Sequence, residues 1–278
     1  MFRERQIAAT ARGVKILARL PFGRKALRYC QGVWPMRPLY RALHGYRRPF
    51  MNLTEAQAAV ASYARQGHEN TRNVESHFEL SAHARPSDYA AFFYFQPLIS
   101  EMHTVFDLGG NAGNLFYCYR EYLEWPSDLT WIVKDLPKNM EAGESVARER
   151  GVTALQFSDD WQRASTADLL IVSGSLHHME KPLSQMIEEL SKQPRFLLVN
   201  RTPLTEGKPV AAIQDAGDFR VACMLYNRLD FIRSLEALGY VMLDQWQAAE
   251  LSLEVPGYPE DRIRAYTGIF FEKRPTSD

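Results

Sequence analysis

The stretch HTVFDLGGNAGN, residues 103–114, decides the fold class that the sequence predicts. Its apolar first half is typical of a buried strand that ends near Asp107. A tight strand-to-helix turn follows, made by Gly109, Gly110 and Gly113, and such a turn lets a ligand approach the backbone closely. The spacing is DxGGNxG rather than GxGxxG, so an acid stands where it suits a positively charged amino-acid group rather than a pyrophosphate.

From residue 103 onward the chain alternates between strand and helix patterns, which indicates a parallel sheet covered on both faces. Apolar strands are expected at 103–108, 129–134, 152–157, 167–173 and 195–200. Helices are expected at 113–123, 137–149, 181–192 and 226–237. The last two strands, YVMLDQWQ and YTGIFFEK, are separated by a short segment with two prolines and should pair antiparallel. The predicted fold is α/β: a Rossmann-like seven-stranded sheet, parallel with an antiparallel C-terminal strand, with helices on both faces and a helical N-terminal extension.

The organisation upstream of the sheet is expected to be helical. Thr54 and Gln57 form a possible capping box for a helix through residue 65, and Ser87 could cap another. An aromatic run is interpreted as core packing between this cap and the sheet, with cover over a substrate pocket as the alternative: Phe92, Phe93, Tyr94 and Phe95. The expected divisions are a basic amphipathic segment 1–50, a helical cap 51–100 and a ligand-binding domain 101–278.

Residues 1–50 are strongly basic in a chain whose formal net charge is zero. They contain twelve Lys or Arg and one acid, Glu4, so the rest of the chain is acidic and unsuited to nucleic acid. Residues 5–20 have the pattern of an amphipathic helix that ends at Pro21, and basic residues then alternate with aromatic ones. Three interpretations stay open: contact with an anionic membrane surface, a basic cap docked on the acidic domain, or an organellar presequence.

Other classes of protein are disfavoured by what the sequence lacks. No apolar run approaches the roughly 20 residues needed to cross a bilayer. Cys30, Cys118 and Cys223 have neither metal-site nor disulfide spacing, so no metal is expected and a reducing compartment fits best. We therefore expect a cytoplasmic protein, or one that is peripheral on the inner face of a membrane.

Acids follow the next two strands in positions that suit one nucleoside cofactor. Asp135, in WIVKDLP, comes 28 residues after Asp107, where a carboxylate can accept both ribose hydroxyls. Asp159 and Asp160 follow the third strand, at the edge where an acid can accept from an adenine amino group. One of that pair could instead cap the following helix. Three acids at successive strand ends thus indicate an adenosyl cofactor.

Residues 103–273 resemble class I S-adenosylmethionine-dependent methyltransferases. The motifs VFDLGGNAG, WIVKDLP, ADLLIVSGSLHH and NRTP, with a later Gln214, are similar to a group of bacterial methyltransferases found among cell-surface polysaccharide genes, and this match extends upstream to about residue 50. The resemblance implies S-adenosylmethionine as cofactor, bordered at its methionine part by Asp107, Gly109 and Gly113, at its ribose by Asp135 and at its adenine by Asp159, with Ser173 at the mouth of the methyl-transfer site. The same cofactor set includes Gly110, Asn111, Leu136 and Asp160. Asn111 stands where the family more often has a third glycine.

Two histidines follow the fourth strand, in SGSLHHMEKP. Plant-type small-molecule O-methyltransferases share the DLP triplet and carry their catalytic histidine in this segment, so the resemblance implies that His177, which aligns better than His178, removes the acceptor proton. An imidazole suits this step because its pKa is near neutrality. The alternative is that the pair only packs or orients the cofactor loop.

The segment that follows the fifth strand, residues 200–228, is expected to be a long polar loop that builds the acceptor pocket. Arg201 can bind a carboxylate or phosphate, and Gln214 and Tyr226 can hydrogen-bond a sugar-like acceptor. The alternatives are a strand-end salt bridge for Arg201 and ordinary surface positions for the other two.

The expected function is S-adenosylmethionine-dependent O-methylation of a sugar, lipid-linked glycan or small metabolite. An NAD(P)-dependent oxidoreductase or epimerase is one alternative, although the GxGxxG spacing and a YxxxK pair are missing. A non-catalytic S-adenosylmethionine-binding accessory protein is another. The sequence does not decide the acceptor, the acceptor atom or the oligomeric state.

Overall fold

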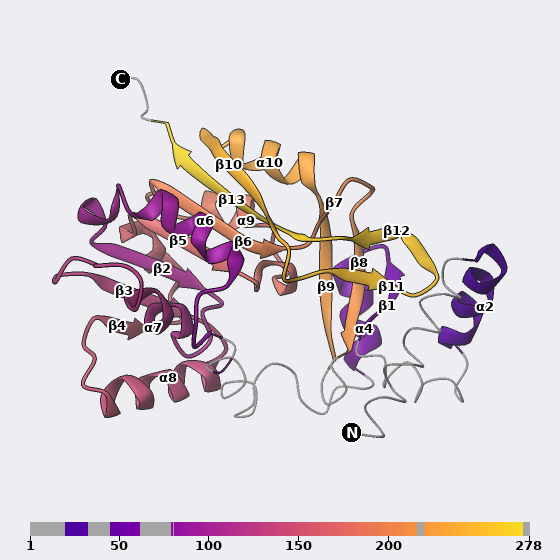
Figure 1. The fold of residues 1–278 in the computed structure, drawn as a ribbon, viewed down its shortest axis with the longest axis horizontal. Coiled ribbons are helices and arrows are strands. Elements are labelled where there is room, and N and C mark those ends of the chain that lie inside the picture. The colour runs from indigo at the N-terminus through magenta and orange to yellow at the C-terminus, as the bar shows by residue number, and fades with distance from the viewer. Residues whose placement is uncertain (1–19, 33–44, 62–78, 80, 216–219, 275–278) are drawn as a thin grey trace. The chain divides into compact units, whose positions relative to one another are not determined.

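A computed structural model describes residues 20–32, 45–61, 79, 81–215 and 220–274 (Figure 1). The chain forms two compact units, each assembled from separate stretches of sequence. The unit that we call the sheet unit comprises His68–Thr202, Leu229–Leu251 and Ala265–Asp278. The unit that we call the insertion unit comprises Met1–Gly67, Pro203–Arg228 and Ser252–Arg264.

The sheet unit contains a seven-stranded sheet with strand order β10-β13-β6-β5-β2-β3-β4 (Figure 1). Its strands are β2 Thr104–Leu108, β3 Thr130–Lys134, β4 Leu155–Phe157, β5 Leu169–Ser173, β6 Phe196–Thr202, β10 Tyr240–Ala248 and β13 Tyr266–Lys273. The strands from β6 to β4 pair parallel, and β13 lies antiparallel between β6 and β10. The predicted Rossmann-like sheet, with its antiparallel C-terminal strand, is confirmed.

Helices α6 Pro86–Phe95 and η2 Ile99–Glu101 precede the first strand of this sheet, and the other helices of the unit lie between its strands along the chain. These are α7 Asn114–Arg120, α8 Pro137–Glu149, η3 Trp161–Thr166, η4 Leu176–His178, α9 Leu183–Glu188 and α10 Arg228–Glu236. Both α6 and α8 begin with a proline, a residue whose fixed φ and missing N–H suit the first helical turn. The predicted helix 137–149 has the observed bounds, whereas α7 and α9 are shorter than expected.

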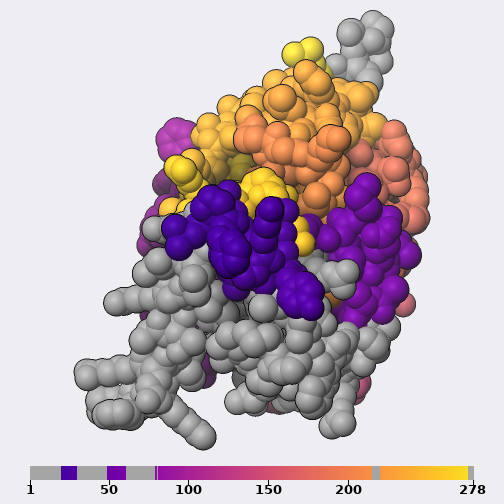
Figure 2. All heavy atoms as spheres, turned by 90° about the vertical axis from the view of Figure 1, so that its right-hand side faces the viewer, coloured from indigo at the N-terminus to yellow at the C-terminus, as the bar shows by residue number. Residues whose placement is uncertain are grey.

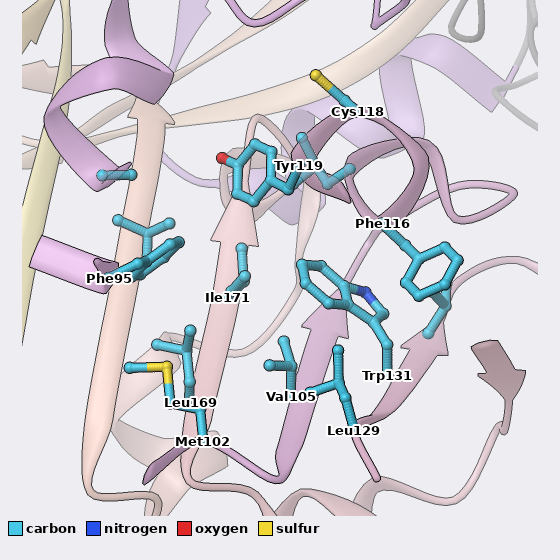
Figure 3. Packing of buried hydrophobic residues seen from close by; sticks show 14 of the residues in the cluster. Phe95, Met102, Val105, Phe116, Cys118, Tyr119, Leu129, Trp131, Leu169 and Ile171 are labelled. Carbon is cyan, nitrogen blue, oxygen red and sulfur yellow. The ribbon is translucent and has the colours of Figure 1, made fainter. Parts of the chain in front are cut away.

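The hydrophobic core of the sheet unit lies between the strands and the aromatic side chains of α6 and α7. Figure 3 shows Val105 and Trp131, from β2 and β3, facing Phe116 and Tyr119 of α7. Phe95 is fully buried in the same cluster, whereas Phe93 is exposed. The interpretation of the aromatic run as core packing therefore holds for its buried members.

The insertion unit contains a four-stranded sheet of order β1-β8-β9-β7 and a separate two-stranded hairpin. Its elements are α2 Pro21–Gly32, β1 Gly45–Phe50, α4 Leu53–Ala61, β7 Leu204–Thr205, β8 Val210–Asp215, β9 Arg220–Asn227, β11 Leu253–Val255 and β12 Tyr258–Ile263. The expected polar loop over 200–228 is wrong, because β8 and β9 pair antiparallel and bury Ala211, Cys223 and Leu225. Short apolar strands inside a polar segment resemble a loop when only the sequence is considered.

The insertion unit also changes the expected divisions of the chain. The strands and helix of residues 45–61 pack with residues 203–228, while α6 belongs to the sheet unit, so boundaries at residues 50 and 100 are not those of the compact units. Pairing of β1 with β8 joins segments far apart in sequence, which local patterns do not report. The expected helix 5–20 lies outside the described residues except for its last position, and Pro21 begins α2.

Two expected helix caps are wrong by a few residues. At α4 the side chain of Asn52 accepts a hydrogen bond from the backbone N–H of Glu55 at 2.9 Å, and the Glu55 carboxylate accepts one from the N–H of Met51 at 3.1 Å. This reciprocal pair is shifted from the predicted Thr54 and Gln57. At α6, Asp88 accepts from the backbone N–H of Arg85 at 2.8 Å, and Ser87 lies within the helix. None of the described helices is long and apolar enough to span a membrane.

Candidate cofactor and acceptor site

The glycine turn between β2 and α7 has a left-handed backbone at three positions. Gly109, Asn111 and Gly113 have φ of 76°, 55° and 84°. Asparagine tolerates this region better than other residues with a side chain, and the Asn111 amide oxygen accepts a hydrogen bond from the N–H of Ala112 at 2.8 Å. Asn111 therefore supplies a left-handed backbone conformation that glycine adopts more readily.

The three glycines of the turn are required for steric reasons. A Cβ on Gly110 would lie 2.5 Å from Cγ of Asp107, and a Cβ on Gly113 would lie 2.6 Å from Cδ2 of Leu155. A Cβ on Gly109 would come closer than 3.0 Å to the side chain of Ser175. The absence of side chains at these three positions therefore lets the turn pack closely against Asp107, Leu155 and Ser175.

Asp107 is a buried carboxyl group at the carboxyl end of β2. The Trp131 indole N–H donates to its Oδ2 at 3.3 Å, and Oδ1 has no hydrogen-bond partner among the described residues. Burial raises the pKa of Asp107 to about 7, against which the Trp131 hydrogen bond acts, while the charge of Asp135 raises it further. A buried carboxyl oxygen without a donor fits a ligand that brings a polar or cationic group.

Asp135, directly after β3, is held in one orientation by three donors. Its Oδ2 accepts from the backbone N–H of Asn111 at 2.8 Å, and its Oδ1 accepts from the N–H of Leu136 at 2.7 Å and from the amide of Asn139 at 2.6 Å. The carboxylate therefore bridges the glycine turn and the start of α8. Sequence reasoning placed Asp135 correctly at the strand end but missed Asn139, because its role depends on helix geometry. The i, i+4 spacing from Asp135 is the signal that could have found it.

The two acids after β4 have different surroundings. Asp160 is the N-cap of η3, and its carboxylate accepts from the backbone N–H of Gln162 at 2.9 Å. The capping interpretation made for one of the pair thus applies to Asp160. Asp159 is exposed, and its backbone carbonyl accepts a hydrogen bond from the Lys134 ammonium group. The assignment of Asp159 to an adenine amino group stays a prediction.

A buried polar network lies at the carboxyl ends of β5 and β6. The guanidinium group of Arg201 forms an ion pair with Asp88 of α6, and their side chains are only 6% and 2% exposed. The same group donates to Oγ of Ser173 at 3.1 Å, and Tyr119 donates its hydroxyl to Asp88 at 2.7 Å. Oε1 of Glu250 lies 3.5 Å from Nε of Arg201 and accepts a hydrogen bond from the Ser87 hydroxyl. Burial alone would raise the pKa of Glu250, but these partners lower it.

This network gives Arg201 the salt bridge that was the alternative interpretation of its position. Its backbone has φ of 54°, a strained value for arginine that directs the side chain into the network. Sequence reasoning missed Asp88 and Glu250, because their partner is 113 and 49 residues away along the chain. Acceptor binding by Arg201 stays a prediction, and its link to Ser173 is the contact that connects it to the proposed methyl-transfer site.

The two histidines of η4 lie directly after β5. His177 is 4% exposed, its ring is 4.1 Å from that of His178 between centroids, and it packs edge-on against Tyr266 at 5.9 Å. Nearby, the Ser175 hydroxyl donates to the backbone carbonyl of Leu108 at 2.7 Å and so ties this segment to the end of β2. These contacts orient the segment after β5 relative to the glycine turn. The catalytic role of His177 and His178 stays a prediction.

Gln214 and Tyr226 belong to the other compact unit. Gln214 lies in β8 opposite Tyr46 of β1 and Val221 of β9. Tyr226 lies in β9 opposite Leu204, and burial raises the pKa of its hydroxyl to about 12. Their role in acceptor binding stays a prediction. The described residues contain no cluster of three or more His, Cys, Asp or Glu side chains that could hold a metal ion.

Comparison with solved structures identifies the class of fold. No protein-family profile and no curated protein sequence matches the chain. The structure of Burkholderia thailandensis 1,6-didemethyltoxoflavin-N1-methyltransferase, with bound 1,6-didemethyltoxoflavin and S-adenosylhomocysteine, aligns with a TM-score of 0.50 at 17% identity, covering 82% of this chain and 93% of that one. A methyltransferase from Aquifex aeolicus aligns over 71% of this chain and 97% of its own, at 15% identity and a TM-score of 0.44. The chain has the Rossmann-like fold of the S-adenosylmethionine-dependent methyltransferases.

Proposed function

We propose that this protein is an S-adenosylmethionine-dependent methyltransferase. The observation that carries the proposal is the Asp135 carboxylate, which directly follows β3, accepts a hydrogen bond from the Asn111 N–H of the glycine turn and is close enough to Asp107 to raise the pKa of that buried carboxyl group. Adjacent strand ends thus bring together a backbone turn that accepts a close ligand and two acids. The antiparallel β13, next to β6, favours a methyltransferase sheet over the parallel sheet of a dinucleotide-binding enzyme.

In the proposed cofactor site, different residues of the sheet unit bind different parts of the cofactor. Asp135 accepts the ribose hydroxyls, Asp159 the adenine amino group, and the backbone around Gly109 and Gly113 borders the methionine part. The unpartnered oxygen of Asp107 lies where a cationic amino group would be stabilised. The bound cofactor supplies an electrophilic methyl group on a sulfonium centre.

The acceptor is proposed to be a hydroxyl-bearing sugar, lipid-linked glycan or small metabolite, methylated on oxygen. The network around Arg201 supports a polar acceptor, since it places buried charges and the Ser173 hydroxyl at the carboxyl ends of β5 and β6. In this proposal His177, which follows Ser173 by four residues, holds the proton that leaves the acceptor hydroxyl. Gln214 and Tyr226, in the insertion unit, are proposed as acceptor-binding residues in their own right.

Cofactor binding is tested by calorimetry with S-adenosylmethionine and S-adenosylhomocysteine. Asp135→Asn keeps an oxygen that can accept hydrogen bonds from backbone N–H groups but removes the negative charge. It should weaken the binding of both ligands by at least about tenfold, which is the effect of losing one charge-assisted hydrogen bond. Asp160→Asn is the matched control, because that acid is exposed and caps η3. Folded wild-type protein that binds neither ligand would refute the proposal, as would equal affinities of the two variants.

Transfer is tested by following S-adenosylhomocysteine release over a panel of monosaccharides, nucleotide sugars and phenols. For any acceptor that responds, His177→Gln should lower kcat by about 10²- to 10⁴-fold and remove the acidic limb of the pH–rate profile, while the affinity for S-adenosylmethionine is retained. A variant with an unchanged pH profile would show that His177 only orients the loop. Cofactor binding without release for any acceptor would favour an accessory protein instead.

A further inference from the structure

Helix α2 of the insertion unit is attached to the rest of its unit through one face. Arg28 donates from Nε to the backbone carbonyl of Gly257 at 2.7 Å, pairs with Glu260, and lies 4.2 Å above the ring centroid of Tyr258. Leu27, next to it in the helix, is buried. The β11–β12 hairpin therefore anchors α2 through Arg28 by a cation–π contact, an ion pair and a hydrogen bond.

The opposite face of α2 is apolar and exposed. Phe22, Lys25, Ala26 and Tyr29 follow the i, i+3, i+4, i+7 spacing of one helix face, and all four are exposed. The side chains of Phe22 and Tyr29 are 86% and 77% exposed. Figure 2 shows α2, in indigo, at the surface of the molecule. The two aromatic side chains thus lie on one exposed face of α2, one turn or more apart on either side of Lys25 and Ala26.

The basic composition of α2 favours an anionic partner. Helix α2 contains Arg24, Lys25 and Arg28 and no acid. Residues 1–50, which include the helix, contain twelve Lys or Arg and a single acid, whereas the chain as a whole is neutral. Aromatic side chains with basic neighbours are the composition of helices that lie in the headgroup region of a bilayer, and each basic residue near an anionic surface adds favourable attraction.

We propose that the outer face of α2, defined by Phe22, Lys25, Ala26 and Tyr29, binds the surface of a membrane that contains anionic lipids. Phe22 and Tyr29 insert at the boundary between headgroups and acyl chains, and Lys25 meets lipid phosphates. Arg28 does not take part, because the hairpin holds its guanidinium group. The inference goes beyond the proposed methyltransferase function and stands independently of it.

The test is flotation of the full chain with vesicles of phosphatidylcholine alone and of phosphatidylcholine mixed with phosphatidylglycerol. The wild-type chain should float with the anionic vesicles at low salt and should lose this binding as salt is raised. The variant Phe22→Ser/Tyr29→Ser should bind at least about tenfold more weakly, the effect of withdrawing two partly inserted aromatic rings. Lys25→Gln should weaken binding less and reduce its salt dependence.

Phe93→Ser is the matched control, because Phe93 is an exposed aromatic residue, 72% accessible, on a helix of the sheet unit. It should float like the wild type. All three variants alter exposed side chains, so unchanged far-ultraviolet circular dichroism is expected and verifies folding. Equal flotation by the Phe22/Tyr29 variant and the wild type would overturn the proposal. The proposal would also be overturned if the wild-type chain did not bind vesicles but formed a dimer, and the Phe22/Tyr29 variant did not form it. The outer face of α2 would then bind a second copy of the chain.

Discussion

Replacing Gly109 with alanine should destabilise the sheet unit by two separable effects. The residue has φ of 76°, and its added Cβ would come closer than 3.0 Å to Cβ and Oγ of Ser175. That hydroxyl donates to the Leu108 carbonyl at 2.7 Å, so Ser175 has no room to move without losing the bond. The substitution therefore combines backbone strain with overpacking at the centre of the proposed cofactor site.

The two effects have different magnitudes. A left-handed backbone costs a residue with a Cβ about 1–2 kcal/mol, and overpacking adds about 1–3 kcal/mol, so Gly109→Ala should lower the free energy of unfolding by roughly 2–5 kcal/mol. Gly151 isolates the first effect. It has φ of 63°, and a Cβ there would meet no atom within 4 Å, so Gly151→Ala should cost only about 1–2 kcal/mol.

Urea unfolding of both variants, followed by tryptophan fluorescence, measures the difference. A third variant, Gly109→Ala/Ser175→Gly, should show a favourable coupling energy in a double-mutant cycle, because it removes the atoms that clash. Equal losses for Gly109→Ala and Gly151→Ala, or no coupling between Gly109 and Ser175, would refute the steric explanation. In that case the glycine would be required for backbone conformation alone.

Three further outcomes are expected. Burial raises the pKa of Asp107 from 3.8 to about 7, so between these pH values the folded protein keeps a proton that the unfolded chain releases. The stability from this group is therefore present below pH 3.8 and is lost as the pH rises to about 7. In urea titrations, Asp107→Asn should reduce this fall in the free energy of unfolding with pH. If the free energy of unfolding of the variant depends on pH as in the wild type, another group causes the dependence. Binding of S-adenosylmethionine at pH 7 should release protons from wild-type protein and not from Asp107→Asn, which calorimetry in buffers of different ionisation enthalpy detects; identical release would contradict it. Arg201→Met should cost about 3–5 kcal/mol because it strands the buried Asp88 carboxylate, whereas Arg228→Met, in an exposed pair with Glu206, should cost about 1 kcal/mol or less in the same thermal unfolding assay. Similar losses would show that burial does not govern the Arg201 pair.

The sequence predicted the sheet well, because its signals are local. Each strand of the sheet is a short apolar run, and each site acid follows such a run at the carboxyl end, so Asp107, Asp135 and Asp159 could be placed without knowing any contact. The same reasoning found the antiparallel C-terminal strand from two prolines in the preceding segment. It failed where strands are short and flanked by polar residues, as in residues 203–228, because β8 and β9 lack a clear alternation of apolar and polar residues.

By itself, then, the sequence determined the class of fold, the glycine turn and the acids at successive strand ends, since the hydrophobic period, the turn residues and the alternation of strands and helices along the chain are local signals. Only the tertiary structure decided that Asn111 takes the left-handed conformation and that Arg201 is bound to Asp88. It also decided that three separate segments build the insertion unit and that α2 turns Phe22 and Tyr29 outward. These features depend on which residues meet across long stretches of chain, and packing of the folded chain, rather than local preference, selects those partners.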